Sequence, residues 1–218
     1  LFRGDSARLY LVRIDCIARQ LRAVHTAPGQ LACGDRTVCD LAGLHRIGLQ
    51  LAASDGSLVW HKTFDFSGGQ HDYGYGVAVD SNSNIYIVGS FYSASSIKNI
   101  WVGKYDSDLV EDWTDSYPSD GSNETTGHSI DVNEQAGLVA ASGIYYSSAP
   151  SSPDGWIRVY DLDGNIQWTQ VWNGTANDYD EARDVALDSN GNLFMTGSVD
   201  DFYFSLRKYN SSGTFQWE

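Results

Sequence analysis

The chain has 218 residues, with 22 glycines, 4 prolines, 13% aromatic residues and a formal net charge of −14. One all-β domain often has about 200 to 250 residues, and abundant glycine and aromatic residues favour short strands and tight turns over helices. The acidic excess argues against a nucleic-acid partner, because phosphate binding requires clustered lysine and arginine.

Residues 1–46 differ in composition from the rest of the chain. They contain 7 Arg and 4 Asp (net +3), which leaves 7 basic and 24 acidic residues (net −17) from residue 47 onward. All three cysteines, Cys16, Cys33 and Cys39, lie in this segment and match no zinc-binding pattern. We interpret 1–46 as an atypical basic segment, with a leader, a foreign stretch, disorder or a different domain as the alternatives. No run approaches the roughly 18 apolar residues of a membrane span.

A repeat with a period near 50 residues begins after this segment. Tryptophans separated by 53, 55 and 49 residues mark it, and they are Trp60, Trp113, Trp168 and Trp217. A tyrosine precedes each of the last three by eight residues, at Tyr105, Tyr160 and Tyr209. This period is typical of a four-stranded propeller blade.

Strand patterns fill each period. "IGLQLAA" and "SLVWHKTF" read as a third and a fourth strand, and "YGVAVD", "NIYIVGS", "IWVGKYD" and "LVEDWTD" follow as one complete unit. Turns such as "DLDGN" and "NSSGT" supply the residues that tight reversals need. The sequence therefore predicts a half blade over 47–66 and complete blades over 75–117, 128–172 and 183–217.

Such units require neighbours. A sheet with apolar residues on both faces gains roughly 1.5–3 kcal/mol per large side chain only where another sheet covers it, and radial stacking leaves short, protected edges. We predict an all-β fold, a β-propeller fragment of about three and a half four-stranded blades over 47–218. Because closed rings usually have about 4 to 8 blades, we expect the rest of a longer propeller chain. The alternative is that 1–46 supplies two strands of a four-blade ring.

Two segments carry a family resemblance. "GVAVDSNSNIYIVGS" (76–90) and "DVALDSNGNLFMTGS" (184–198) are followed by "WVGKYDSDLVEDW" and "LRKYNSSGTFQW". Over residues 47–218 the chain resembles the bacterial and archaeal SBBP-type β-propeller repeat family, and NHL-like repeats are a looser match. The resemblance implies a surface or secreted propeller without shared catalytic residues. The middle copy departs from the pattern, with "DVNEQAGLVAASG" at its first turn.

Three turn segments have the alternating oxygen side chains of calcium loops. They are "DSNSN" (80–84), "DLDGN" (161–165) and "DSNGN" (188–192). Calcium loops end in a bidentate acid, and the first and third segments have Val88 and Thr196 there. Hairpin turns require the same residues, so we predict turns, with no metal and no cofactor.

One group of polar residues lies at the starts of the innermost strands. Tyr75, His128 and Arg183 occupy equivalent positions, and Asp131 stands where the other copies have alanine. A buried carboxylate needs partners, so we predict a ligand-binding site at one mouth of the channel, formed by Tyr75, His128, Asp131, Arg183 and Asp184. The alternative is an exposed strand end at which Arg183 pairs with Asp184 or Glu181.

The five histidines share no motif, and no nucleophile signature accompanies them. We therefore predict a non-enzymatic, extracellular or cell-surface binding scaffold, for a protein or carbohydrate ligand. Glycosylation sequons at Asn123, Asn173 and Asn210 are compatible with export. The alternatives are a propeller-based enzyme, such as a lyase or glycan hydrolase, and a purely structural spacer.

Overall fold

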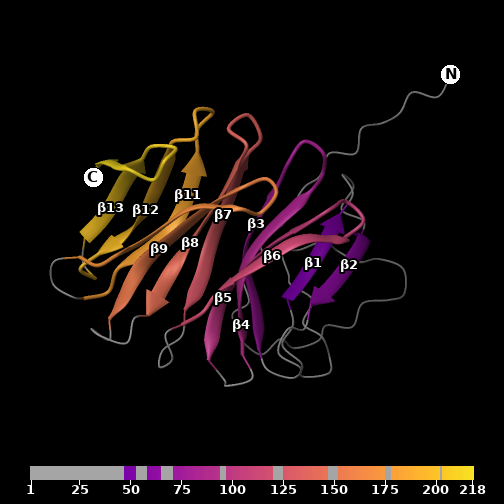
Figure 1. Cartoon of the computed structure of the whole chain (residues 1–218). Coiled ribbons are helices and arrows are strands. Elements are labelled where there is room, and N and C mark those ends of the chain that lie inside the picture. Colours follow the sequence, from indigo (N-terminus) through magenta and orange to yellow (C-terminus); the bar gives the residue numbers. More distant parts are fainter. Residues whose placement is uncertain are drawn as a thin grey trace, which may run out of the picture.

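The computed structural model describes residues 47–52, 58–64, 71–93, 97–119, 125–146, 152–174, 178–201 and 203–218. The predictions for residues 1–46, including the three cysteines, lie outside these ranges. All regular elements of the described residues are β-strands (Figure 1). No helix in this part of the chain has the length and apolarity that a membrane crossing requires.

The strands form one two-stranded and three four-stranded sheets, all antiparallel and ordered as in the chain. The two-stranded sheet contains β1 (Ile47–Ala52) and β2 (Leu58–Phe64). Blade I contains β3 (Asp72–Val79), β4 (Ile85–Tyr92), β5 (Lys98–Tyr105) and β6 (Glu111–Tyr117). Blade II contains β7 (Thr126–Asn133), β8 (Leu138–Tyr146), β9 (Pro153–Asp161) and β10 (Ile166–Trp172). Blade III contains β11 (Glu181–Leu187), β12 (Leu193–Val199), β13 (Tyr203–Tyr209) and β14 (Phe215–Trp217). The predicted all-β propeller fold is confirmed.

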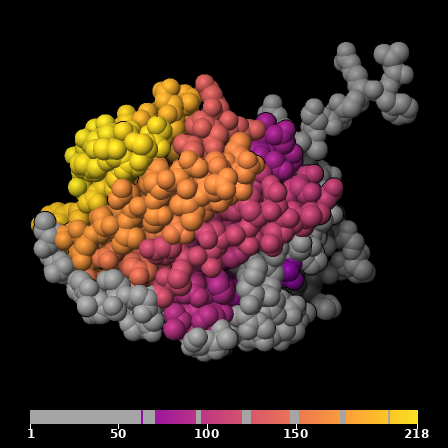
Figure 2. Space-filling view, viewed as in Figure 1, coloured from indigo at the N-terminus to yellow at the C-terminus, as the bar shows by residue number. Residues whose placement is uncertain are grey.

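The first strands of the three blades lie beside one another, and the blades follow in chain order across the molecule (Figure 1). Equivalent residues of these strands, β3, β7 and β11, lie in contact: Tyr75 contacts His128, and Ser129 contacts Asp184. They are the innermost strands that the sequence predicts. Blade III is at one side of the described body (Figure 2).

The aspartate at the start of each predicted turn accepts backbone hydrogen bonds. Asp188 Oδ1 accepts from the amides of Asn190 and Asn192 at 2.9 and 2.8 Å, and Asp188 Oδ2 accepts from Asn192 Nδ2 at 2.7 Å. Asp80 has the same three partners in blade I. The hydrogen bond from the asparagine side chain holds the pKa of Asp188 below its usual value. The carboxylates therefore close the turns.

The departing turn of the middle copy also forms a hairpin. β7 pairs with β8 from Thr126 to Asn133, and Asn133 Oδ1 accepts the amide of Ala136 at 3.0 Å. Gly137 completes this turn at φ +69°. A four-residue turn (134–137) thus replaces the five-residue turn, and the strand pairing extends to Asn133 and Leu138.

Each innermost strand has a β-bulge near its start, and a glycine faces it from the second strand. The register shifts between Gly127 and Ser129 in blade II, and at the equivalent places in blades I and III. A Cβ on Gly143 would lie 2.1 Å from the carbonyl oxygen of Thr126, and Gly89 and Gly197 have equally close carbonyls. The bulge folds the strand's backbone onto its neighbour, which only glycine permits.

Tryptophans on the fourth strands join consecutive blades. Trp113 Nε1 donates a hydrogen bond to the carbonyl of Leu162 at 3.1 Å, and its ring lies 5.3 Å from that of Tyr160. A Cβ on Gly164, at φ +86°, would lie 2.6 Å from the Trp113 ring. Trp168 repeats the arrangement in blade III, on Ser211, Tyr209 and Gly213. We call this contact the tryptophan clasp.

Apolar side chains fill the space between the blades. One cluster joins blades I and II through buried residues: Tyr86, Val88, Ile100, Val102, Ile130, Val139, Ala141, Trp156 and Tyr160. A second joins blades II and III through Ala140, Ile157, Val159, Ala182, Val185, Leu187, Leu193, Met195 and Tyr209. Blade II thus covers blade I, and blade III covers blade II.

We expect Gly143→Ala to destabilise the fold by about 2–3 kcal/mol, because the added methyl group meets rigid backbone. Gly137→Ala is the matched control in the same blade. It adds a methyl group to open space at positive φ, so it should cost only about 1 kcal/mol. Urea unfolding of both variants measures the difference, and equal losses would contradict the steric explanation.

We expect Trp113→Ala to cost about 2–4 kcal/mol, because it removes a clasp between two blades. Trp217 is the equivalent residue in blade III and is 42% exposed, so Trp217→Ala should cost less than about 1 kcal/mol. Thermal and urea unfolding compare the two variants. A loss at Trp217 as large as that at Trp113 would show that the clasp is not the stabilising contact.

Candidate functional site

The three equivalent residues of the predicted site are the extra residues of the three bulges. Tyr75 lies between Gly74 and Gly76 at the register shift of β3. His128 and Arg183 lie at the corresponding shifts of β7 and β11. A bulge leaves its extra residue outside the ladder and re-aims its side chain. The repeat thus presents one side chain per blade from the same backbone position.

Aromatic rings continue this line along β3. The rings of His71 and Tyr73 stack with centroids 6.1 Å apart, and those of Tyr73 and Tyr75 stack at 5.9 Å. The edge of His128 meets Tyr75 at 6.2 Å, and Lys98 Nζ lies 5.0 Å from the centre of the Tyr73 ring. Rings and charges therefore extend from blade I into blade II.

Glu181 links this line to blade III. Its side chain is 4% exposed, and one carboxylate oxygen lies 3.0 Å from His128 Nδ1. The other accepts a hydrogen bond from Arg183 at 2.8 Å. Burial favours the neutral acid, but the contacts with His128 and Arg183 outweigh it and lower the pKa of Glu181. We call His71, Tyr73, Tyr75, His128, Glu181 and Arg183 the bulge row.

The two predicted aspartates lie elsewhere. Asp184 Oδ1 accepts a hydrogen bond from Ser129 Oγ, between β7 and β11. Asp131 Oδ2 accepts the backbone amide of Leu187 at 2.7 Å. Three residues of a strand span about 10 Å, so Asp131 is not part of the group around His128. The structure brings Tyr75, His128 and Arg183 together, and the carboxylate that joins them is Glu181.

Sequence reasoning named Glu181 only as an alternative partner of Arg183, and that ion pair is present. Its equivalents in blades I and II are Tyr73 and Thr126, paired with Ser90 and Ile144 as Glu181 is with Ser198. No repeated residue type marks this position. The contact with His128 depends on how two blades are offset, which a single strand does not encode.

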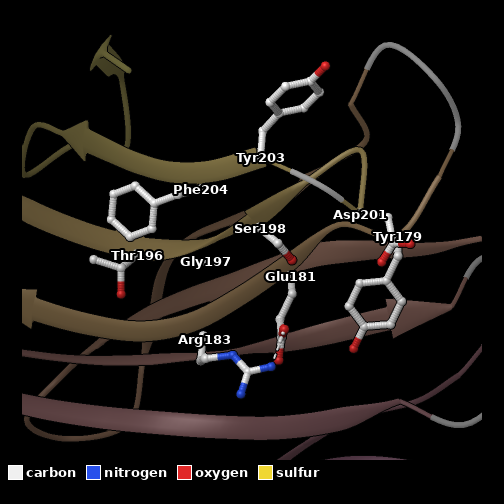
Figure 3. Close-up of a pocket in the computed structure, with 9 residues that line it drawn as sticks. All are labelled: Tyr179, Glu181, Arg183, Thr196, Gly197, Ser198, Asp201, Tyr203 and Phe204. Carbon is white, nitrogen blue, oxygen red and sulfur yellow. Dashed lines mark hydrogen bonds and ion pairs between the residues drawn. The ribbon is translucent and has the colours of Figure 1, made fainter.

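A groove of about 530 Å³ opens beside the bulge row on the side of blade III that faces away from blade II (Figure 3). Its lining residues are Tyr179, Glu181, Arg183, Thr196, Gly197, Ser198, Asp201, Tyr203 and Phe204. Burial and the nearby Glu181 carboxylate raise the pKa of Tyr179 to about 12. The structure's described residues contain no cluster of three metal-ligating side chains.

Residues 67–90 match the family model for the SBBP beta-propeller repeat, which confirms the resemblance to this repeat family there. One similar solved structure is described as the extracellular domain of a one-component system, BT4673, from B. thetaiotaomicron. It is 17% identical with a TM-score of 0.45, and the match covers 78% of this chain and 20% of that one. This chain thus spans about a fifth of that protein's length. No curated protein matches the chain.

We expect Glu181→Gln to destabilise the fold by about 1–2 kcal/mol at pH 7, less than for a fully buried ion pair because Arg183 is largely exposed. The folded-state pKa of Glu181 is lowered, so its stabilisation is present above its unfolded pKa and is lost as the pH falls through the folded value. The difference between wild type and variant should shrink between pH 7 and pH 3.

Urea unfolding at both pH values measures this change. Glu111→Gln is the control, because Glu111 is exposed and an amide oxygen still accepts the hydrogen bond from Tyr105. A wild-type advantage over Glu181→Gln that is the same at pH 3 as at pH 7 would rule out a charge-based role for Glu181.

Proposed function

We propose that this propeller domain is a non-enzymatic binding scaffold at the cell surface or outside the cell, and that its ligand contacts the bulge row. One observation carries the proposal. A single backbone position, repeated in three blades, presents a phenol, an imidazole and a guanidinium side by side, while the surrounding strands and turns repeat. Different side chains presented from one repeated position of a rigid scaffold are what a recognition surface requires.

Carbohydrate is the ligand class that the bulge row favours. Its aromatic rings offer flat apolar faces, and the exposed Arg183, held by the buried Glu181, offers a charged hydrogen-bonding group beside them. Sugars combine an apolar ring face with hydroxyl edges, so both kinds of group find a partner on one ligand. An extracellular location is supported by the SBBP match, since this resemblance implies a surface or secreted protein.

A non-catalytic role is supported by the state of the row's carboxylate. General acid–base chemistry uses titratable groups whose pKa values are pushed apart, with one acid kept protonated near neutral pH. Glu181 is instead held ionised between His128 and Arg183, and its pKa is lowered. The nearby Asp184 carboxylate is engaged by Ser129.

A glycan array probed with the full chain tests the proposal. We expect saturable binding that Arg183→Ala weakens at least roughly tenfold, since a charge-assisted contact contributes about 1.5–3 kcal/mol. The control Gln167→Ala, at an exposed position on the fourth strand of blade II, should bind within about twofold of wild type. Absence of saturable binding would overturn the carbohydrate assignment, and formation of a cleaved product would overturn the non-enzymatic one.

A further inference from the structure

One face of blade III is apolar and exposed. We define the terminal face as the side turned away from blade II, formed by Ala186, Phe194, Thr196, Phe204, Leu206 and Trp217. Phe204 is 76% exposed, Leu206 39% and Trp217 42%. An exposed cluster of large apolar side chains marks an interaction surface.

The equivalent face of blade I is an interface. Thr196 pairs with Leu206 in blade III as Val88 pairs with Val102 in blade I, which also makes Ile100 the equivalent of Phe204. Val88 and Ile100 are 0% exposed, because blade II covers them. In blade II the equivalents of Val88 and Val102 are Ser142 and Ile157, which are also 0% exposed, and Ile157 packs in the cluster shared with blade III. The terminal face thus repeats a surface that is covered in both earlier blades.

The groove beside the bulge row has an equivalent in these interfaces. The residue before the innermost strand of blade II or blade III donates its backbone amide to the third strand of the preceding blade. Thr125 donates to the Lys98 carbonyl at 3.0 Å, and Asp180 donates to that of Pro153 at 2.9 Å.

At the interface between blades I and II, the start of β7 fills the space at Val88. Gly127 donates its amide to Ser90 Oγ at 3.3 Å, and a Cβ there would lie 2.4 Å from Val88 Cγ2. Thr196 and Ser198, the equivalents of Val88 and Ser90, line the groove of blade III (Figure 3). The groove has the position of an entry site for an innermost strand.

Blades II and III, which each cover the preceding blade, share an arginine, a tyrosine and a glycine. Arg158 lies over the ring of Tyr117 at 4.4 Å, and Arg207 lies over the ring of Trp172 at 4.9 Å. Both rings belong to the fourth strand of the preceding blade. A tyrosine follows two residues later and a glycine four residues after that, in "RVYDLDG" and "RKYNSSG", and both receive the tryptophan clasp. Blade I has "GKYDSDL" instead, without the arginine and the glycine.

We infer that the terminal face is the docking surface for a further four-stranded blade of this repeat, joined to blade III as blade III is joined to blade II. This blade carries Arg-x-Tyr-x-x-x-Gly on its third strand and turn, its glycine lies on Trp217, and its innermost strand enters the groove. A second copy of this chain fits less well, because its first blade lacks both the arginine and the glycine. This inference does not depend on the proposed function.

The test extends the chain after Trp217 with a copy of one of its own repeats. Each copy begins at the residue after the tryptophan that aligns with Trp217: Thr169 to residue 217 for blade III, Thr114 to residue 172 for blade II, or His61 to residue 117 for blade I. Phe204→Cys reports coverage of the face by its rate of thiol labelling, with peptide mapping to separate it from the native cysteines. Val110→Cys, at an exposed turn of blade I, is the control.

We expect the thiol at position 204 to react rapidly in the 218-residue chain, and at least roughly tenfold more slowly when the copy of blade II or blade III is attached. The copy of blade I should protect it less, and labelling at position 110 should not change. The copies of blades II and III both carry Arg-x-Tyr-x-x-x-Gly, so the test does not depend on the folding of one copy alone.

Unchanged labelling of position 204 with both the copy of blade II and the copy of blade III would overturn the inference. Equal protection by the copy of blade I would overturn the role of the arginine and glycine. Protection of position 204 in the 218-residue chain that increases with protein concentration would identify a second copy as the occupant, and would also overturn it. Glycan binding is measured separately, so each of these results leaves the proposed function to its own test.

Discussion

The tryptophan clasp is the contact on which the arrangement of blades depends. A four-stranded sheet with two apolar faces is not stable alone, and the clasp fixes where the next sheet lies by three linked requirements: an indole N–H needs a carbonyl, its ring needs a flat partner, and the partner's turn needs a glycine. Because these requirements recur at Trp113 and Trp168, the same offset recurs between blades. The bulges, and the side chains they project, are therefore placed at constant intervals.

Much of this architecture is encoded locally, and those parts were predictable. Strand positions follow from runs of branched and aromatic residues, turns from Asp and Gly, and the blade from the interval between tryptophans. The bulges were not predicted, because an extra residue such as His128 looks the same in a regular strand. Their one signal is the glycine on the facing strand, in "VGS", "ASG" and "TGS". Together with the pairing register, these glycines indicate that the backbone of the innermost strand lies too close for a side chain at Gly89, Gly143 and Gly197.

The contacts of the site are only partly encoded in the local sequence. Equivalence between repeats identified Tyr75, His128 and Arg183, and the bulges explain why these three project together. It did not place Asp131 or identify Glu181 as the link, because those outcomes depend on contacts across blades. Asp131 faces Leu187 of the next blade and accepts its amide, so the polar substitution for an alanine serves an interface. A partly buried carboxylate is satisfied by a donor that the neighbouring sheet supplies.

Blade I differs from the other two blades at the turn between its third and fourth strands. It lacks the turn glycine, yet Leu109 holds the same left-handed conformation at φ 62°, which costs about 1 kcal/mol in a residue with a branched side chain. Leu109 packs against the buried cluster of Ile85, Ile87, Trp101 and Tyr105, and this apolar contact offsets the strain. Turn geometry is thus preserved even where its preferred residue is absent, because the fourth strand must start in register. The glycines at 164 and 213 have an added reason, since a tryptophan ring occupies the space of their missing side chain.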